Sequence, residues 1–229
     1  MKIIVCVKQV PDSAAKISVE DGKVDWHDAP LVINPWDEFA VEAALVQKDA
    51  HNDSNVITIS VGPESAKEAL KHTLAMGCSE AVLISDPALS MPDSQITARV
   101  IAAAIQKIGE TDLVIMGRQS IDTDMGTTAI QVARILGWPV LTLVSAISSI
   151  DPVARVIQIE RVIEEGCQLI ESCLPAVISV VKDIGEPRYP SFMGIRKAQK
   201  TPIPIWSVAD LGLISIEPAV TCIEVIDPP

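Results

Sequence analysis

The chain has few aromatic residues, with four Trp, two Phe and one Tyr among 229 residues. Its core must therefore be filled mainly by Val, Ile, Leu and Ala. Because β-branched residues favour strands and Ala favours helices, this mixture suggests that strands and helices alternate. The length suits one large domain or two small ones and is ample for a hydrophobic core.

Positive charge is also scarce. Lys and Arg number 18 against 30 Asp and Glu, which gives a formal net charge of -12. Proteins that bind nucleic acid usually carry the opposite sign, because phosphate contacts need Lys and Arg. We therefore expect no nucleic-acid partner.

The cysteines are five in number and scattered, and no two of them have CxxC spacing. This pattern argues against a disulfide framework and against a zinc site, and it favours free thiols in a reducing compartment. No apolar run is long enough to span a membrane, and no signal or transit segment precedes the first apolar run. We expect a cytoplasmic bacterial or archaeal protein without membrane insertion.

Several catalytic and nucleotide-binding motifs are missing. The chain contains no GxGxxG, no GxxxxGK[ST] and no GxSxG sequence, so a Rossmann site, a P-loop and a nucleophile elbow are not supported. His27, His51 and His72 lie in polar or helix-surface contexts, which favours solvated side chains over catalytic bases. We expect a protein without catalytic residues of its own.

Short apolar runs alternate with helical patterns over roughly the first 147 residues. The predicted strands are 2–7, 56–61, 81–84, 113–116 and 140–144. The predicted helices are 35–50, which starts after Asn34 as N-cap, 65–75, 94–108 and 127–136. Such alternation predicts an α/β fold with a parallel, doubly wound sheet covered on both faces.

The pattern changes after this region. Residues 156–162 and 167–170 predict a β-hairpin around an EEG turn, a smaller hairpin is expected at 16–24 around Asp21-Gly22, and 176–181 is a further strand. After Ile184 the chain is rich in Pro, Arg, Lys and Gly and has little periodicity. We therefore expect an α/β nucleotide-binding domain at 1–184 and an extended loop segment with a C-terminal extension at 185–229.

The stretch GRQSIDTDMGTT, residues 117–128, follows the fourth predicted strand, and ligands of open parallel sheets bind beyond the carboxyl ends of the strands. Gly117 permits close approach of the backbone, and Gly126-Thr127-Thr128 places amides and hydroxyls at a helix N-terminus, which favours an anion. Asp122 and Asp124 could accept hydrogen bonds from a ribose. Two other interpretations stay open: the aspartates form only local turns, or they belong to a carboxylate metal site that lacks a third ligand.

The stretch EPRYPSFMGIRKAQKTPIPIW, residues 186–206, concentrates positive charge in an acidic chain. Phe192 and Met193 resemble an exposed apolar anchor, and a large apolar group rimmed by charge suits partner docking. The basic residues beside them are Arg188, Arg196, Lys197 and Lys200. The alternative is that Phe192 folds back onto the core and that the basic side chains only solvate the segment.

Taken together, these segments resemble the beta subunit of electron transfer flavoproteins. The resemblance extends over nearly the whole chain and rests on KIIVCVKQVPD, NPWDEFAVEAAL, LAMGCSEAVLI, GRQSIDTDMGTT, RVIEEGCQLIESCLPAVISVV and EPRYPSFMGIRKAQK in that order. No single motif would be specific, but their order is. The resemblance implies an adenine-nucleotide-binding α/β fold of the HUP-like kind.

The resemblance also implies a heterodimer whose alpha subunit makes most contacts to a redox FAD, while the beta subunit helps to enclose that FAD and buries a structural AMP. Such a protein carries electrons from acyl-CoA or similar flavin dehydrogenases, as in fatty acid oxidation, to a quinone oxidoreductase or another acceptor. By position, the AMP contacts would be Cys6, Asn34, Pro35, Trp36, Asp37, Val61, Gly117, Arg118, Gln119, Ser120, Ile121, Asp122, Thr123, Asp124, Met125, Gly126, Thr127 and Thr128.

The family's docking loop inserts an apolar side chain into partner dehydrogenases, and Phe192 occupies that position. Met193 and the basic residues Arg196, Lys197 and Lys200 accompany it, and some family members are methylated at the positions of the two lysines. The family's helical C-terminal arm, which embraces the alpha subunit, has no counterpart before residue 229. Ser13 is small where members often contact flavin with a large residue.

Three rival functions stay open. A bifurcating type of beta subunit would bind a second FAD in place of AMP, but residues 126–128 lack the TxxVGP-like pattern associated with that type. A stand-alone ATP-using enzyme would need a glycine-rich or basic triphosphate loop, whereas KQVPDS offers one lysine and no glycine. A nucleotide-sensing or purely structural module would lack redox partners.

Overall fold

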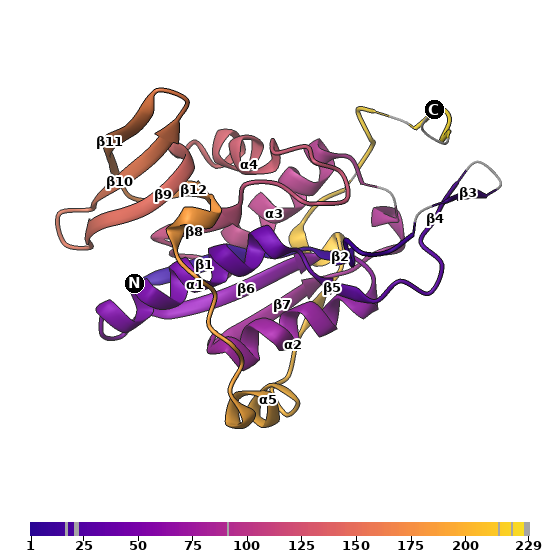
Figure 1. Cartoon of the computed structure of the whole chain (residues 1–229), viewed down its shortest axis with the longest axis horizontal. Coiled ribbons are helices and arrows are strands. Elements are labelled where there is room, and N and C mark those ends of the chain that lie inside the picture. The colour runs from indigo at the N-terminus through magenta and orange to yellow at the C-terminus, as the bar shows by residue number, and fades with distance from the viewer. Residues whose placement is uncertain (17, 21–22, 91, 215, 221, 227–229) are drawn as a thin grey trace.

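We describe a computed structural model that covers every residue except 17, 21–22, 91, 215, 221 and 227–229. Its centre is a nine-stranded sheet with the order β11-β10-β9-β12-β8-β1-β6-β7-β13 (Figure 1). In that order the strands are Gly166–Cys173, Val156–Ile163, Val140–Asp151, Ala176–Val180, Leu113–Gly117, Lys2–Cys6, Asn55–Val61, Glu80–Ile84 and Ile205–Trp206. Two short pairs, β2 (Gln9–Pro11) with β5 (Leu31–Ile33) and β3 (Ser18–Glu20) with β4 (Lys23–Asp25), lie outside this sheet.

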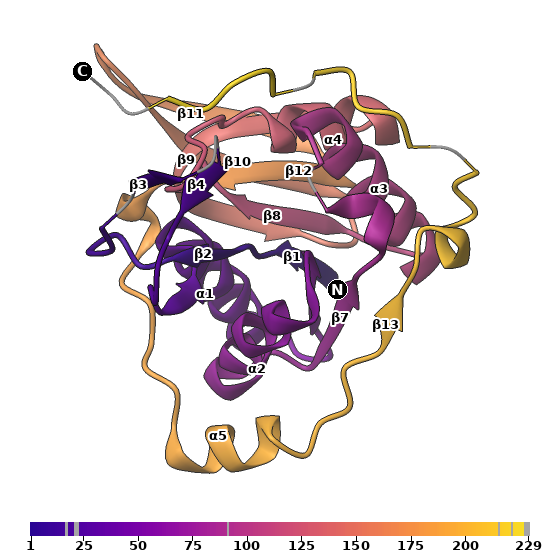
Figure 2. The same cartoon turned by 90° about the vertical axis from the view of Figure 1, so that its right-hand side faces the viewer.

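Strands β9, β12, β8, β1, β6, β7 and β13 are parallel to one another. Strands β10 and β11 extend the sheet at one edge and pair antiparallel. Helices α1 (Pro35–Ala50) and α2 (Lys67–Met76) cover one face. Helices α3 (Ser94–Ile108) and α4 (Thr128–Leu136) cover the other face (Figure 2). The predicted doubly wound parallel sheet is thereby confirmed.

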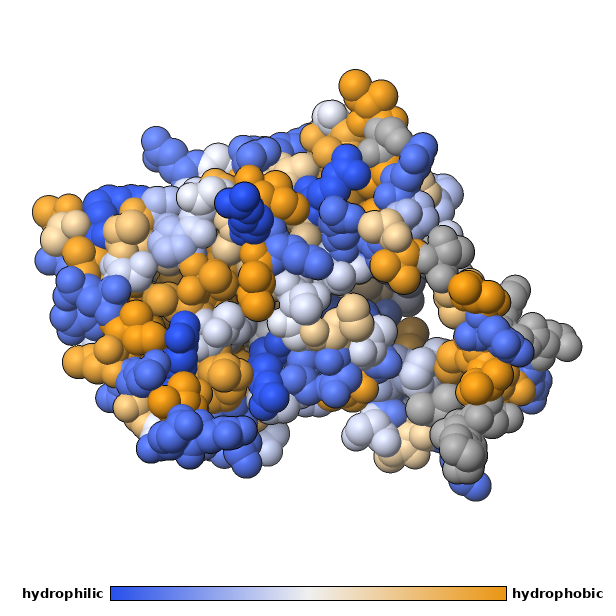
Figure 3. Space-filling model, turned by 90° about the horizontal axis from the view of Figure 1, so that it is seen from above, coloured by the Kyte–Doolittle hydropathy of each residue, from blue (hydrophilic) through white to orange (hydrophobic). Residues whose placement is uncertain are grey.

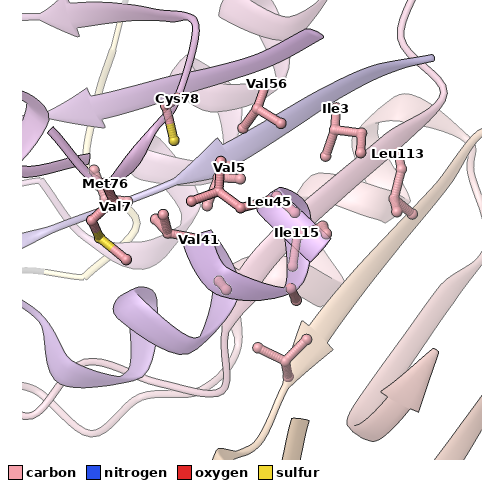
Figure 4. Close-up of a cluster of buried hydrophobic side chains, with 14 of the residues drawn as sticks. Ile3, Val5, Val7, Val41, Leu45, Val56, Met76, Cys78, Leu113 and Ile115 are labelled. Carbon is pink, nitrogen blue, oxygen red and sulfur yellow. The ribbon is translucent and has the colours of Figure 1, made fainter. Parts of the chain in front are cut away.

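The central strand β1 shows why its sequence is almost entirely apolar. Ile3 and Val5 belong to the core beneath α1 and α2, whereas Ile4 and Cys6 belong to the core beneath α3 and α4. A strand with both faces covered has no solvent side, so every position is apolar. Figure 4 shows side chains of the first core gathered between β1, α1 and β8. Full burial of each large aliphatic side chain stabilises the fold by about 1.5–3 kcal/mol.

The helix ends follow local signals in the sequence. The Asp93 carboxylate accepts the N–H of Ile96 at 2.7 Å, which caps the N-terminus of α3. Gly137 ends α4 with a φ of 71°, a left-handed conformation that costs glycine no steric clash. The helix predicted at 65–75 is divided into a 3-10 turn, η1 (Glu64–Ala66), and α2. Further 3-10 turns are η2 (Pro87–Leu89), η3 (Lys182–Ile184) and η4 (Ala209–Leu211).

Strand β9 is longer than the predicted 140–144, because it changes partner along its length. Its first half pairs parallel with β12, and its second half pairs antiparallel with β10. Register shifts and a φ of 59° at Leu143 mark the change. The antiparallel β10–β11 hairpin turns at residues 164–165. In the small hairpin, β3 and β4 pair antiparallel, and the predicted Asp21-Gly22 turn lies outside the described residues.

The segment after residue 184 is more regular than its composition indicates. The expectation of a loop around Phe192 was wrong, since Phe192–Ala198 forms helix α5. Its N-cap is Ser191, whose hydroxyl accepts the N–H of Gly194 at 2.9 Å. A helix of 7 residues is too short for a recognisable period. The chain then adds β13 beside β7, and the predicted domain boundary at residue 184 stays a prediction.

Helices in the described part of the chain are either too short or too polar to cross a lipid bilayer. On the side where α3 and α4 lie, apolar residues are interspersed among hydrophilic ones (Figure 3). Exposed examples are Met125, Ile130 and Ile135, in and before α4.

Candidate functional site

The predicted nucleotide-binding residues gather where β1, β6 and β8 end. Because these strands are parallel, their carboxyl ends meet at one edge, and β1 lies directly between β6 and β8. The loop 117–127 leaves this edge and leads into α4. Asn34 and the first turn of α1 lie against the same loop. The structure therefore brings together residues that are far apart in the sequence.

Asn34 holds the loop from the side of α1. Its Nδ2 donates to the carbonyl oxygen of Gln119 at 2.9 Å, and its Oδ1 accepts the N–H of Ile121 at 3.2 Å. It occupies the N-cap position of α1, but its side chain makes no capping hydrogen bond. The predicted N-cap position is confirmed, but the Asn34 side chain bonds to the loop instead of capping the first turn of α1.

Asp37 ties together the exits of β1 and β8. Its Oδ2 accepts the N–H of Lys8 at 2.7 Å, and the backbone N–H of Gly117 also donates to its carboxylate. Burial raises the pKa of Asp37 to about 7, against the opposing effect of these hydrogen bonds and of one from Asn34. The carboxylate is thus engaged by the protein itself, so its role is to position the backbone.

Gly117 is the position of closest approach. A Cβ on Gly117 would lie 2.5 Å from Oδ1 of Asp37 and 2.7 Å from the carbonyl carbon and oxygen of Trp36. No real side chain tolerates such contacts. Gly117 therefore allows the end of β8 to lie against the first turn of α1, as the expected close backbone approach requires.

Trp36 and Arg118 lie in contact with each other next to Gly117. The guanidinium of Arg118 lies 5.8 Å from the centre of the Trp36 ring, a cation–π contact. Trp36 is also in contact with Phe39, at 6.3 Å between ring centres. Pro35, the first residue of α1, precedes this pair. The contact holds the positive charge of Arg118 at the start of the loop.

Lys8 is a site residue that sequence reasoning missed. Its Nζ lies 2.6 Å from Oδ2 of Asp122 and 3.5 Å from Oγ of Ser120. The signal was present, since Lys8 immediately follows the apolar run of the first strand and is the lysine in KQVPDS. The ion pair neutralises an aspartate that would otherwise repel an anion bound to the loop.

The middle of the loop is held by local hydrogen bonds. Oγ of Ser120 and Oγ1 of Thr123 are 2.8 Å apart, and the N–H of Asp124 donates to the carbonyl oxygen of Ser120 at 2.9 Å. Nε2 of Gln119 donates to the carboxylate of Asp124, which has a φ of 53°. Asp124 therefore forms part of a local turn, which is one of the interpretations left open by the sequence. Asp122 instead forms the ion pair with Lys8.

The start of α4 carries polar groups without protein partners. Oγ1 of Thr127 and Oε1 of Gln131 are two of the three buried side-chain N or O atoms without a hydrogen bond in the described residues. The first N–H groups of a helix also have no partner within the helix. The backbone at Gly126 is left-handed, with a φ of 59°, and Met125 beside it is exposed. Gln131, which also donates to Ser94, was not predicted.

Cys6 and Val61 flank the site from the sheet. Cys6 is buried in the core beneath α3 and α4, and burial raises the pKa of its thiol, so the sulfur stays protonated. Val61 is the last residue of β6 and packs against the same core.

The surface next to the loop is hollowed. A cavity of about 180 Å³ is lined by Pro11, Asp12, Ser13, Ala15, Trp26, Ile121 and Asp122. A wider hollow of about 620 Å³ lies at the amino ends of the strands, between Met1, Asp53 and Arg155. We place the candidate site at the smaller cavity, because ligands of parallel sheets bind at the carboxyl ends of the strands.

The loop is not the place in the described residues where metal-ligating atoms gather most closely. That place is Glu20, Asp25 and His27 on the β3–β4 hairpin, which lies outside the main sheet. In the loop, Asp122 is engaged by Lys8 and Asp124 by Gln119. These contacts leave the loop aspartates poorly suited to a metal.

The predicted docking residues lie away from the loop. Phe192 is 74% and Met193 is 70% exposed on α5, so Phe192 does not fold back onto the core. Helix α5 packs against α2 (Figure 2). Arg196, Lys197 and Lys200 are exposed. The structure therefore separates two candidate surfaces, one for a nucleotide and one for a partner.

Comparison with known proteins finds a matching family and several relatives. Residues 21–211 match the electron transfer flavoprotein domain. A caffeyl-CoA reductase-Etf complex subunit, CarD, of Acetobacterium woodii is 42% identical over 93% of this chain and 80% of that protein. Electron transfer flavoprotein subunit beta of Megasphaera elsdenii is 38% identical over 89% of this chain and 77% of its own length. Protein FixA of Azorhizobium caulinodans is 36% identical over 94% and 78% respectively.

The domain match covers most of the chain, and its bounds include both the 117–128 loop and α5. Fold, order of motifs and relatives agree. The chain belongs to the electron transfer flavoprotein family, in which it is a beta subunit with a role in electron transfer.

Proposed function

We propose that the chain binds AMP at the 117–128 loop and helps to enclose an FAD held mainly by an alpha subunit. The observation that carries this proposal is the start of α4, where the buried oxygens of Thr127 and Gln131 lack partners beside unpaired helix amides. Such a helix N-terminus favours a phosphate. Arg118 and the pairing of Lys8 with Asp122 make the surroundings less negative.

The residues present fit an adenylate. Gly126, Thr127 and Thr128 would hold the phosphate through amides and hydroxyls, and the loop backbone held by Asn34 would face the ribose and base. The neighbouring cavity of about 180 Å³ is smaller than typical ligand pockets of about 300–1,000 Å³. It would therefore take part of the nucleotide, with the remainder along the exposed residues 123–126.

The FAD would supply the redox chemistry, and the protein would supply placement and electrostatics. In this division of labour the chain is a carrier subunit without catalytic residues of its own. Its contribution is a rigid sheet edge, a nucleotide that fills the loop and a surface that closes over the flavin of the alpha subunit. The predicted cytoplasmic location stays a prediction.

For α5 we propose docking to the electron donor. Tyr189, Phe192 and Met193 are 96%, 74% and 70% exposed, and basic residues surround them in a chain of net charge -12. This combination suits an apolar pocket rimmed by carboxylates on a flavin dehydrogenase. The name of the Acetobacterium relative places it in a complex with a caffeyl-CoA reductase, which supports an acyl-CoA-type partner. The acceptor would be a quinone oxidoreductase or a similar protein.

The alternative within the family is a second FAD in place of AMP. Co-expression with an alpha subunit, release of the cofactors with denaturant and nucleotide analysis will decide between them. We expect one FAD and one AMP per heterodimer, and a yellow complex only when both subunits are present. Two flavins without AMP would establish the alternative, and a heterodimer with one flavin and no second nucleotide would refute nucleotide binding at the loop.

A further inference from the structure

Two connecting segments, called here the first and the second arm, join helix α5 to the rest of the protein. Residues 185–190 lead to it from the end of β12 and η3, and residues 199–204 lead from it to β13 (Figure 2). The second arm is fixed at its end, where the N–H of Leu83 donates to the carbonyl oxygen of Pro204 at 3.0 Å. In both views α5 lies beside α2, on the far side of that helix from the sheet (Figures 1 and 2).

The first arm is clamped to α1 by Arg188. Its Nε donates to Oε2 of Glu42 at 2.9 Å, and its Nη2 donates to Oε1 at 2.9 Å, which makes a bidentate ion pair. The backbone N–H of Arg188 donates to Oε2 at 3.0 Å, and Nη1 donates to Oδ2 of Asp49 at 2.9 Å. Charge-assisted bidentate pairs are strong and fix geometry. Glu42 is only 8% exposed, so its charge depends on this partner.

The helix itself touches α2 at a glycine. A Cβ on Gly194 would lie 2.2 Å from the carbonyl oxygen of Ala75 and 3.2 Å from its carbonyl carbon. The backbone of α5 therefore rests directly on the last turn of α2. Any larger residue at position 194 would push α5 away from α2.

These anchors matter because α5 cannot hold itself in place. With 7 residues it is too short to be stable as an isolated helix. Only Ala198 of α5 is buried, whereas Phe192 and Met193 are mostly exposed. The apolar residues of α5 therefore contribute little to its attachment, and its orientation depends on Arg188 and Gly194.

We propose that Arg188 and Gly194 are positioning residues that hold α5 in the orientation in which Phe192 meets the donor dehydrogenase. This inference rests on the proposed docking role of α5. Neither residue needs to touch the donor: Arg188 acts through Glu42, and Gly194 acts through contact with Ala75. A fixed helix lowers the entropy lost on docking, so loosening it weakens the encounter complex.

The experiment uses the full heterodimer and measures flavin reduction by the donor dehydrogenase over a range of heterodimer concentrations. We expect Arg188→Ala and Gly194→Ala each to raise KM about 5- to 10-fold, with kcat within about 2-fold of the parent protein. Arg155→Ala is the matched control, since Arg155 pairs with Asp112 at 2.6 Å at the opposite edge of the sheet. It should leave KM unchanged.

Hydrogen exchange provides a readout that a general loss of stability would not imitate. The N–H of Ile195 donates to the carbonyl oxygen of Ser191 at 2.9 Å, and the N–H of Gln199 donates to the carbonyl oxygen of Ile195 at 3.1 Å. Both amides should exchange faster in Arg188→Ala, while amides of α3 and α4, on the other face of the sheet, keep their rates. Equal acceleration throughout the chain would overturn a local positioning role.

A double-mutant cycle with Phe192→Ala separates the two proposals. If Arg188 acts through α5, the KM of the double variant should be less than 2-fold above the KM of Phe192→Ala alone. A raised KM in Phe192→Ala with an unchanged KM in Arg188→Ala would overturn the positioning role and leave docking intact. An unchanged KM in Phe192→Ala would overturn docking itself. Should Arg188→Ala fail to assemble, Gly194→Ala decides alone, and an unchanged KM in that variant overturns the proposal.

Discussion

Gly117 and Asp37 are packed so closely that a Cβ on the glycine would lie 2.5 Å from Oδ1 of the aspartate. The contact joins the end of β8 to the first turn of α1. Because Asp37 also accepts the N–H of Lys8 at 2.7 Å, one carboxylate aligns the exits of two neighbouring strands. The proposed nucleotide loop starts from this alignment.

Gly117→Ala should therefore damage the site. Overpacking of this kind costs about 1–3 kcal/mol, and the displaced loop should no longer retain its nucleotide. The measurement is the melting temperature and the AMP content of the purified heterodimer. Gly62→Ala is a matched control, because a Cβ there would meet Ala66 at an ordinary 3.4 Å. Equal melting temperatures for both variants would refute the close contact.

Asp37 should make stability depend on pH. Its pKa of about 7 in the folded protein exceeds the ordinary value of 3.8, so the folded state binds the proton more tightly. The stabilising contribution is complete below the ordinary value and is lost as pH rises through about 7. From pH 6 to 8, the free energy of unfolding should fall by about 1 kcal/mol from this group.

Asp37→Asn should remove that component of the pH dependence. Chemical denaturation at pH 6 and pH 8 measures it, and the exposed Glu165→Gln is the control that should retain it. If the parent protein and Asp37→Asn lost equal stability over this range, the titration would belong to another group.

Lys8 should protect the loop from the charge of Asp122. Lys8→Met leaves that aspartate unpaired, so AMP affinity should weaken about 10-fold, equivalent to about 1.4 kcal/mol. Lys8→Met combined with Asp122→Asn should restore most of the affinity, because the repelling charge is gone. Calorimetric titration of nucleotide-depleted heterodimer with AMP checks both. Failure of the double variant to recover would mean that Lys8 binds the nucleotide directly.

Asn34→Ala should free the loop without disturbing the sheet. The carbonyl of Gln119 and the N–H of Ile121 would lose their partner, which costs about 1–3 kcal/mol for groups that stay buried. Amide exchange within 119–124 should accelerate, whereas exposed Asn52→Ala should change nothing. Protection that stays at the parent level would show that the loop is held by its own turns.

Electron uptake should depend on salt. If α5 meets a carboxylate-rimmed surface, the apparent second-order rate should fall as ionic strength rises, since screening shortens the reach of charges to about 10 Å at 0.1 M. Lys197→Gln with Lys200→Gln should flatten this dependence, and Lys182→Gln, on η3, should not. Stopped-flow reduction at several salt concentrations measures it. A parallel dependence in all three proteins would contradict charge steering by α5.

Sequence and structure agree wherever the signal is local. The helix predicted at 94–108 is observed with the same bounds, and the structure shows Asp93 and Gly109 as its capping residues. The strands buried on both faces were predicted from continuous apolar runs. The failures have local reasons too: α5 is too short for a period, and β9 changes partner in mid-strand.

The sequence by itself determined the alternation of strands and helices, the glycine that opens the loop and the basic segment with its apolar pair. Those properties depend on neighbours within a few positions along the chain. Only the tertiary structure decided the pairings: Lys8 with Asp122 is separated by 114 positions and Arg188 with Glu42 by 146. Such contacts exist because the parallel sheet brings β1 beside β8 and because the chain returns across α1, and no local pattern encodes either distance.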